Sequence, residues 1–388
     1  MKITAVTPIP ASVQLGRLPM SFCFVRVETD EGLVGFGEAC DSFGATYAGV
    51  IAEIVTQALS PLLVGRELVA VEPVVELLKL STRRRLGDKG VAAQARSAVE
   101  IALTDLVAQA AGRSVSEHLG QVRDRVDVYA SSTFLDEGPA PFHADLLAPL
   151  LERGVRLAKV RIGPEWQQDL RTLAELRGLL PDDLELMIDG SDTFTLPTAV
   201  QIAERLGDLG VRWFEEPIPQ ANRAGIAALA AKSTVPIAYG EHLYGREDFL
   251  DALAHDGISV VQPDASTSGG IAEARAVAGL AAYYGARVVP HICAGPIALA
   301  ANLALAATVH TINLIEYPFF LAPAWDALGA GEKFGIQAIE NGSLPVPSGP
   351  GLGVSLADDV ATRFPYQLPG ARISGTVAGV LDRFVGDR

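Results

Sequence analysis

The hydrophobic pattern divides the chain into a short alternating region and a longer series of apolar runs. Residues 22–40, FCFVRVETDEGLVGFGEAC, form two alternating runs joined by Asp30, Glu31 and Gly32. This pattern predicts a β-hairpin, and the alternating start, MKITAVTPIP, predicts a third strand beside it. Helical patterns follow near 45–60, 71–84 and 91–111. We therefore expect an α+β domain over residues 1–124.

Eight short apolar runs follow, separated by helical patterns. They are VDVYASS (126–132), RLAKVRI (156–162), LELMI (184–188), VRWFE (211–215), VPIAYG (235–240), ISVVQ (258–262), ARVVP (286–290) and INLIE (312–316). The order predicts βα units, and eight evenly spaced strands favour a closed α/β barrel over a doubly wound sheet. We place this barrel at residues 125–355, and we expect residues 356–388 to return to the first domain.

Composition and charge exclude several classes of partner. Of the 388 residues 49% are hydrophobic, and the formal net charge is −15. This charge argues against nucleic acid, because phosphate binding needs clustered Lys and Arg. No apolar window reaches the roughly 20 residues of a membrane span, and no signal peptide is visible. Three widely spaced cysteines form neither a disulfide framework nor a zinc site, so we expect a cytoplasmic protein.

Polar residues at the ends of the runs predict a metal site. Asp189, Glu215 and Glu241 are each separated from the next by 26 residues, one βα unit. In a barrel they would converge at the mouth, where their mutual repulsion calls for a cation. Oxygen ligands without Cys favour one Mg²⁺ per subunit, with Mn²⁺ as a substitute. The alternative, that each caps the following helix, suits one such residue better than three in register.

Groups able to move protons surround this predicted site. Lys159 and Arg161 lie two residues apart and therefore project to the same side of a strand. Asp264 and His291 follow neighbouring strands, close enough for the carboxylate to orient the imidazole. A lone histidine is more often structural, so the Asp partner and the strand-end setting carry this prediction. A metal flanked by bases suits removal of the proton α to the carboxylate of a small molecule.

These motifs together resemble the enolase superfamily, and the Asp264 and His291 pair resembles its mandelate racemase subgroup. The likeness covers nearly the whole chain and includes the segments GLVGFGEA, KVRIG, WFEEP, YGEHL, QPDASTSGG and PHICAGPIALAANLALAA. It implies a modified (β/α)₇β TIM barrel beneath an N-terminal α+β capping domain. It further implies that Mg²⁺ binds Asp189, Glu215 and Glu241, and that a protonated Glu316 hydrogen-bonds the substrate carboxylate.

Two positions depart from the family pattern. Arg161 replaces the second lysine of the usual Lys-x-Lys, and a guanidinium is a poor base. Arg161 therefore suits binding of the substrate carboxylate, and Lys159 remains a candidate for proton transfer or for the same binding. Ser191 stands where Asn is frequent, and it predicts that a contact orienting the metal ligand is left to water.

The single good base, His291, favours dehydration over racemisation, which needs acid and base on opposite faces. Our leading prediction is a Mg²⁺-dependent hydro-lyase that converts an aldonate or aldarate to a 2-keto-3-deoxy acid. The alternatives are a sugar-lactone cycloisomerase, a racemase or epimerase of a hydroxy acid, and a degenerate binding protein that keeps the metal without catalysis.

Substrate choice is expected from cap segments 14–24 and 42–50. Arg17 and Tyr47 are the candidate substrate contacts there, and ordinary cap packing is the alternative for both. The likeness also predicts a homo-oligomer.

Glu215 and Glu216 in WFEEPIP should have different roles, because adjacent residues of a strand point to opposite faces. Glu215 is the predicted metal ligand, and Glu216 is predicted to turn outward to a salt bridge or a helix start.

Overall fold

The structure, a computed structural model, describes residues 1–15, 18–40 and 47–368. Its N-terminal sheet has the order β1 (Ile3–Leu15), β2 (Leu18–Thr29) and β3 (Val34–Ala39), with both pairs antiparallel. The predicted hairpin is confirmed, and Gly32 takes the positive φ of 80° that its turn requires.

Helices cover one side of this sheet. They are α1 (Ala48–Ile54), a π-helical turn (Val55–Leu59), α2 (Ser60–Leu63), α3 (Val71–Leu86), α4 (Val91–Ala110) and α5 (Val115–Leu119). The α4 helix packs directly on β3, and a Cβ atom on Gly37 would lie 1.8 Å from the carbonyl oxygen of Ala98. Glycine in the GLVGFGEA segment thus permits the close approach of helix and strand.

Eight parallel strands form the second region. They are β4 (Arg125–Phe134), β5 (Leu157–Arg161), β6 (Glu185–Asp189), β7 (Phe214–Glu215), β8 (Ile237–Tyr239), β9 (Val260–Val261), β10 (Arg287–Val288) and β11 (Leu314–Pro318). The sheet order is β10-β9-β8-β7-β6-β5-β4-β11, and Glu316 N donates to Pro290 O at 3.2 Å between its two ends. The predicted capped TIM barrel is confirmed.

Several strands are shorter than the apolar runs that predicted them. Parallel pairing nevertheless continues past their regular parts: Arg212 N donates to Leu186 O at 2.8 Å, and Gln262 N donates to Tyr239 O at 2.9 Å. Each apolar run therefore corresponds to one strand of the barrel.

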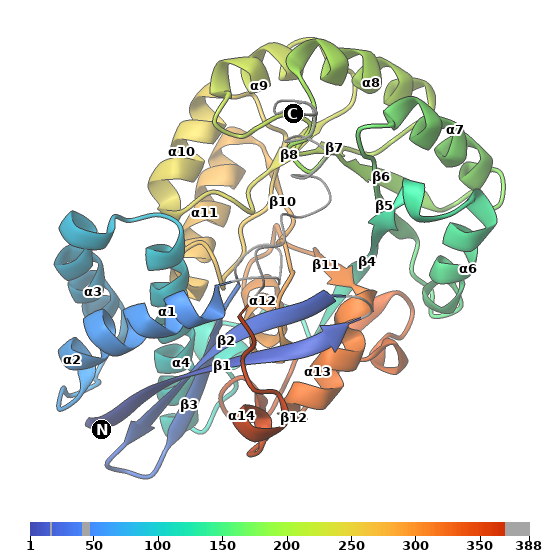
Figure 1. The fold of residues 1–388 in the computed structure, drawn as a ribbon. Helices are drawn as coiled ribbons and strands as arrows, with labels where there is room; N and C mark the ends of the chain where they lie inside the picture. Colours follow the sequence, from blue (N-terminus) through green and yellow to red (C-terminus); the bar gives the residue numbers. More distant parts are fainter. Residues whose placement is uncertain (16–17, 41–46, 369–388) are drawn as a thin grey trace, which may run out of the picture.

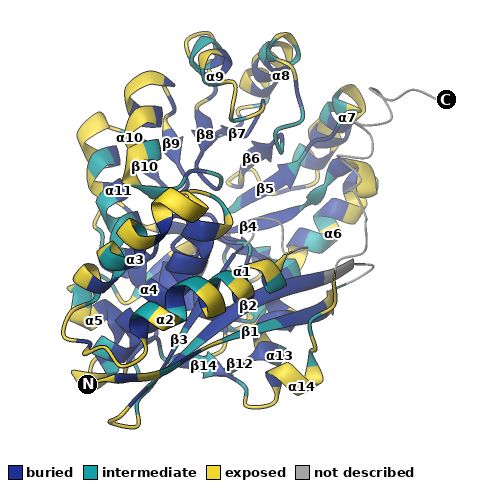
Figure 2. Cartoon of the chain, turned by 60° about the vertical axis from the view of Figure 1, so that its left-hand side comes forward, coloured by how far each residue is buried: buried dark blue, intermediate teal, exposed yellow. Residues whose placement is uncertain are grey.

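Seven helices connect the eight strands, and the first six of them form the outer wall in Figure 1, while the seventh lies between the barrel and the cap. They are α6 (Ala140–Leu151), α7 (Trp166–Arg177), α8 (Leu196–Asp208), α9 (Arg223–Ala230), α10 (Gly245–His255), α11 (Ile271–Tyr284) and α12 (Pro296–Ala307). Figure 2 shows buried strands inside helices whose outer faces are exposed. The α12 helix is buried along its whole length, which explains its Ala-rich sequence.

Two buried carboxylates of the cap hold it on the barrel. Glu38 accepts hydrogen bonds from the backbone N–H groups of Gly295 (2.5 Å) and Ala298 (2.9 Å) at the start of α12. Glu100 accepts them from Ile271 (2.8 Å) and Ala272 at the start of α11. Helix N-termini attract negative charge, so each carboxylate caps a barrel helix across the interface.

The chain returns toward the cap after the barrel. This part contains α13 (Ala322–Leu328), β12 (Gly329–Gly331), β13 (Ser343–Pro345), β14 (Val354–Leu356) and α14 (Val360–Arg363). Phe364 O then accepts from Ser12 N at 3.1 Å, which places this segment beside β1. Among the described residues, no helix combines the length and apolar character that a membrane crossing needs.

Candidate active site at the barrel mouth

Strand alternation builds the floor of the site and the polar row above it. Eight apolar side chains, one from each strand, cluster inside the barrel: Tyr129, Leu157, Met187, Trp213, Ala238, Val260, Val289 and Leu314. Two residues further along each strand, side chains return to the same face. Those positions hold Ser131, Lys159, Asp189, Glu215, Gly240, Gln262, His291 and Glu316. The site is therefore a single polar row on an apolar floor.

Lys159 lies at the centre of the inner cluster, which we define as Lys159, Asp189, Glu215 and Glu316. Its Nζ lies 2.5 Å from Glu215 Oε1, 2.9 Å from Glu316 Oε1 and 3.4 Å from Asp189 Oδ2. All four side chains are buried. Burial alone would lower the pKa of Lys159, but the surrounding carboxylates raise it well above its ordinary value. Lys159 is therefore an ammonium cation, suited to binding a carboxylate rather than to accepting a proton.

Negative charge remains in excess in the inner cluster. Burial raises the pKa of Glu215 to about 7; Lys159 lowers it in part, while the like charges of Asp189 and Glu316 raise it further. For Glu316 the effect of burial is outweighed by Lys159, His291 and Arg161, which bring its pKa to about 2. These cations favour the ionised form of Glu316 in the free protein, and the protonated form that the family likeness implied for the substrate complex stays a prediction.

Arg161 extends the positive charge toward the mouth. Its Nε lies 3.1 Å from Asp189 Oδ2, and its Nη2 lies 4.0 Å from Glu316 Oε1. Burial would lower the pKa of this guanidinium, but Asp189 and its neighbours raise it above the ordinary value. Arg161 is therefore unsuited to act as a base, in agreement with the sequence interpretation.

Ser191 orients one of the predicted metal ligands. Its backbone N–H and its hydroxyl both donate to Asp189 Oδ1, at 2.8 and 3.1 Å. The expectation that this contact is left to water was wrong. A positive φ of 44° at Ser191 bends the loop back and lets its short side chain reach the carboxylate.

Asp264 and His291 are in contact on the opposite wall. Asp264 Oδ2 lies 3.1 Å from His291 Nδ1, and His291 Nε2 lies 3.3 Å from Glu241 Oε2. Burial would lower the pKa of His291, but Glu241 and Asp264 raise it to about 10. Three further donors hold the carboxylate in place, because Asp264 Oδ1 accepts from Ser266 N at 2.8 Å, from Ser266 Oγ at 2.6 Å and from Asn302 Nδ2 at 3.0 Å.

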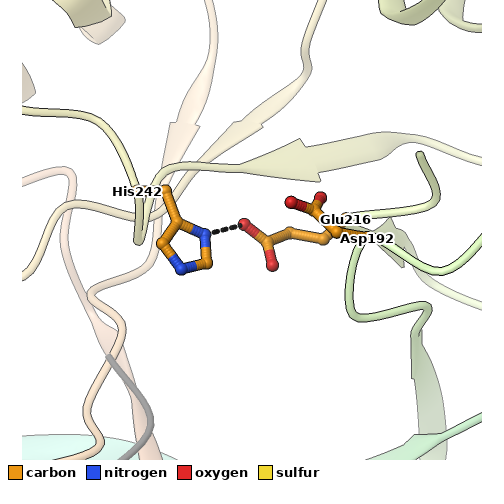
Figure 3. A group of neighbouring side chains, drawn as sticks. All are labelled: Asp192, Glu216 and His242. Atoms are coloured by element: carbon orange, nitrogen blue, oxygen red, sulfur yellow. Dashed lines mark hydrogen bonds and ion pairs between the residues drawn. The ribbon is translucent and has the colours of Figure 1, made fainter. Parts of the chain in front are cut away.

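A second group of ionisable residues, the outer cluster, lies beside these strand ends and comprises Asp192, Glu216 and His242 (Figure 3). His242 Nδ1 lies 2.9 Å from Glu216 Oε1, and His242 Nε2 lies 3.9 Å from Glu241 Oε1. Among the described residues this is the one group of three whose possible ligand atoms all lie within 4.8 Å of one another.

Glu216 differs from Glu215, as WFEEPIP predicted, and it forms a salt bridge, as also predicted, but with His242 inside the protein and not at the surface. Its side chain is buried, at 2% exposure, and its φ is +39°. The carboxylate turns to His242 instead of to the inner cluster (Figure 3). The reason is the positive φ, which takes Glu216 out of regular strand geometry and keeps it under the loop after β8.

The predicted metal ligands are divided in this structure. Asp189 and Glu215 share Lys159, while Glu241 contacts His291. Their joint role as metal ligands stays a prediction. Of the two cap candidates, Arg17 lies outside the described residues, and Tyr47 precedes α1 with 59% of its surface exposed. Its contact with substrate also stays a prediction.

Sequence reasoning missed several polar residues around the site. Asn302 is the single polar residue in PIALAANLALAA, and this contrast could have identified it. The outer cluster gave a weaker signal, because Asp192 and His242 lie in loops where strand alternation does not apply. Gln262 could have been found, since it stands two residues before Asp264 at the end of an apolar run.

Comparisons with known proteins identify relatives over nearly the whole chain. The N-terminal domain model of the mandelate racemase / muconate lactonizing enzyme family matches residues 3–120, and an enolase C-terminal domain-like model matches residues 143–360. The D-galactarolactone cycloisomerase of Agrobacterium fabrum is 31% identical over 94% of this chain and 99% of its own. The arabinonate dehydratase of Saccharolobus solfataricus is 30% identical over 89% of this chain and 91% of its own.

Solved structures agree with this result. The 3,6-anhydro-D-galactonate cycloisomerase from Zobellia galactanivorans superposes with a TM-score of 0.85, at 27% identity over 95% of this chain and all of its own. A racemase from Streptomyces coelicolor A3(2) with bound magnesium gives a TM-score of 0.84, at 26% identity over 93% of this chain and 99% of its own. Relatives of this chain thus include dehydratases, cycloisomerases and a racemase.

Proposed function

Since this chain belongs to the mandelate racemase / muconate lactonizing enzyme family, we propose that it removes the proton α to the carboxylate of a sugar acid and expels a β-oxygen. The leading reaction is dehydration of an aldonate or aldarate to a 2-keto-3-deoxy acid. The observation that supports it most is the placement of His291 between two carboxylates, Asp264 and Glu241, across the mouth from the cationic Lys159.

The carboxylates at the mouth suit a divalent cation. Asp189 and Glu215 already converge on one positive charge, the ammonium of Lys159, and one cation cannot balance two carboxylates. Asp189, Glu215 and Glu241 offer only oxygen ligands, which Mg²⁺ prefers. Bound there, Mg²⁺ would cancel carboxylate charge, lower the pKa of His291 and stabilise negative charge developing on the substrate carboxylate.

Each residue of the site then has a distinct task. Lys159 and Arg161 bind the substrate carboxylate, because both remain cations in this environment. Asp264 fixes the imidazole through Nδ1, which leaves His291 Nε2 as the atom that accepts the α proton. The protonated ring can afterwards return that proton to the departing β-oxygen, so one residue serves as base and then as acid.

Cycloisomerisation of a sugar lactone is the second candidate. It uses the same α-proton removal, but the leaving oxygen belongs to the ring and no water is lost. The match to the D-galactarolactone cycloisomerase over 94% of the chain supports this second reaction. Racemisation has less support, because Arg161 occupies the position of a second base.

A panel assay tests the proposal. Aldonates, aldarates and their lactones are incubated with the protein and Mg²⁺, and products are measured by mass spectrometry. Loss of one water with formation of a 2-keto-3-deoxy acid indicates dehydration, and ring opening without loss of mass indicates cycloisomerisation. Turnover of no member of the panel contradicts the proposal.

A matched pair of histidine variants tests the assignment of the base. His291→Asn should lower turnover by about 10²–10⁴-fold, because it removes the acid/base group. His255→Asn, on α10 with the side chain 70% exposed, should retain full activity. In deuterated water, an active enzyme exchanges the α proton of a bound acid, whereas a binding protein without catalysis shows no exchange.

A further inference from the structure

Gln262 occupies a place in the polar row that the proposed reaction leaves without a task. Val260 packs in the apolar floor inside the barrel, and Val261 packs in the core between the strands and the surrounding helices. Because side chains of a strand alternate between its two faces, the side chain of Gln262 points to the inside, like that of Val260. Only 1% of its surface is exposed, and its Nε2 has no hydrogen-bond partner among the described residues. A buried amide donor without a partner is rare in folded proteins.

The position of Gln262 brings it to the inner cluster. In a closed eight-stranded barrel, the four side chains of one layer come from alternate strands. The layer formed by β5, β7, β9 and β11 would then contain Lys159, Glu215, Gln262 and Glu316. The ion pairs from Lys159 to Glu215 and to Glu316 agree with this grouping. Gln262 is thus the neutral member of a charged layer.

The two strands beside β9 determine which groups lie near the side chain of Gln262. On one side β8 carries Gly240, and a Cβ atom there would lie 2.4 Å from the backbone nitrogen of Gln262. Three backbone atoms of Gln262 lie within 2.7 Å of that position, so β8 and β9 pack backbone against backbone here and β8 adds no side chain to this sector of the row. On the other side β10 leads to His291. The amide therefore stands on the same wall as the proposed proton-transfer group.

Protein oxygens in this layer already have other donors. Glu215 accepts from Lys159 and from Trp213 Nε1 at 3.2 Å, and Glu316 accepts from Lys159 and from Ile292 N at 3.1 Å. A bound molecule is therefore the natural source of an acceptor for the amide. A planar carboxylate or the enolate derived from it offers oxygens with free lone pairs at this depth.

We propose that Gln262 is a substrate-binding residue whose buried amide N–H donates to a carboxylate oxygen of the bound sugar acid beside His291. This inference rests on the proposed function. This role explains why the amide N–H of Gln262 has no partner in the free protein. Burying an unpaired donor is unfavourable, and the hydrogen bond to the substrate offsets that unfavourable free energy when the substrate binds. Gln262 would then discriminate between ligands by the position of their carboxylate.

The test uses Gln262→Met, which keeps the length of the side chain and removes both polar atoms. Oxalate serves as a planar probe for the carboxylate, and Mn²⁺ serves as the metal. Titration calorimetry on the full chain gives the affinity for Mn²⁺ alone and then for oxalate in the Mn²⁺-loaded protein. We expect Mn²⁺ affinity within about twofold of the parent, and oxalate affinity about tenfold weaker, from the loss of a hydrogen bond to a charged group.

Thermal unfolding without metal provides the second readout. Gln262→Met should unfold at the same temperature as the parent or higher, because no hydrogen bond is lost. Gln109→Met is the matched control: Gln109 Nε2 donates to Val34 O at 2.9 Å in the cap, so this variant should unfold earlier yet bind oxalate normally.

Three results would overturn the inference. Unchanged oxalate affinity in Gln262→Met would show that the amide does not contact the carboxylate. An equal loss of Mn²⁺ affinity would assign Gln262 to support of a metal ligand, and a lower unfolding temperature would assign it to structure. A parent protein that binds no Mn²⁺ would instead contradict the proposed function itself, so the two failures are distinguishable.

Discussion

The inner and outer clusters come from the same strand ends and differ in how the backbone presents them. Asp189 and Glu215 are the last residues of β6 and β7 and face Lys159 inside the barrel. Asp192 and Glu216 lie three and one residues later and gather with His242 (Figure 3). A shift of one residue along the chain thus moves a carboxylate from one cation to another.

The backbone conformations explain this separation. Residues of the inner cluster lie on regular strands, where side chains alternate between two faces. Asp192 and Glu216 have positive φ values of 57° and 39°, which break that alternation. The inner cluster is therefore positioned by the barrel and the outer one by its loops, which suggests reaction chemistry for the first and support for the second.

The largest expected effect is a difference in Mg²⁺ affinity and turnover between variants of Glu215 and of Glu216. Glu215→Gln removes a proposed metal ligand, so Mg²⁺ affinity and turnover should fall by roughly 10³-fold. Glu216→Gln alters a neighbour of the ligands and should cost about 10–100-fold. Calorimetric Mg²⁺ titrations of both variants provide the comparison, and equal losses of affinity would show that the two clusters do not have distinct roles.

Lys159→Met should produce the next largest effect, on stability. Removing the cation leaves Glu215 without its cationic partner and leaves Asp189 and Glu316 with Arg161 alone. Breaking a buried ion pair in this way costs about 3–5 kcal/mol in the free energy of unfolding. Urea denaturation measures it, and added Mg²⁺ should restore part of the loss because the carboxylates can bind it instead.

Lys79→Met is the control for this variant. Lys79 pairs with Glu247 at 3.1 Å on the surface, where an ion pair contributes less than about 1 kcal/mol. If Lys159→Met is no more destabilising than Lys79→Met, the inner cluster does not depend on the lysine.

The contrast between the clusters also explains which features could be predicted from the sequence. All eight barrel strands and the contact of Asp264 with His291 could be predicted, because period-two alternation and strand-end polarity are local signals. Barrel geometry also predicted that Lys159 lies near Asp189 and Glu215, and the structure brings these three side chains together. These predictions needed only the order of strands.

Features that depend on loop conformation or long-range packing could not be predicted. The burial of Glu216 requires a positive φ in a residue other than glycine, which no propensity indicates. The bond from Asn302 to Asp264 joins residues 38 positions apart through the packing of α12. The placement of Glu38 on the start of α12 depends likewise on how the cap sits on the barrel.

The smallest expected effect is a pH dependence of the free energy of unfolding that comes from His242 in the outer cluster. Burial would lower the pKa of His242, but the bond to Glu216 and the charges of Glu216 and Glu241 raise it from 6.5 to about 9. The folded state therefore holds this proton more tightly than the unfolded chain. Its stabilising contribution is complete below pH 6.5 and is lost as the pH rises through about 9.

Comparing the parent with His242→Gln in metal-free buffer measures this contribution. Between pH 6.5 and 9.5 the free energy of unfolding of the parent should fall by about 3 kcal/mol more than that of the variant, because a neutral amide does not titrate. Chemical denaturation at four pH values across this window gives both curves. Parallel curves would mean that His242 is not charged by the outer cluster, and Glu216 would then be held there by packing and by its backbone conformation alone.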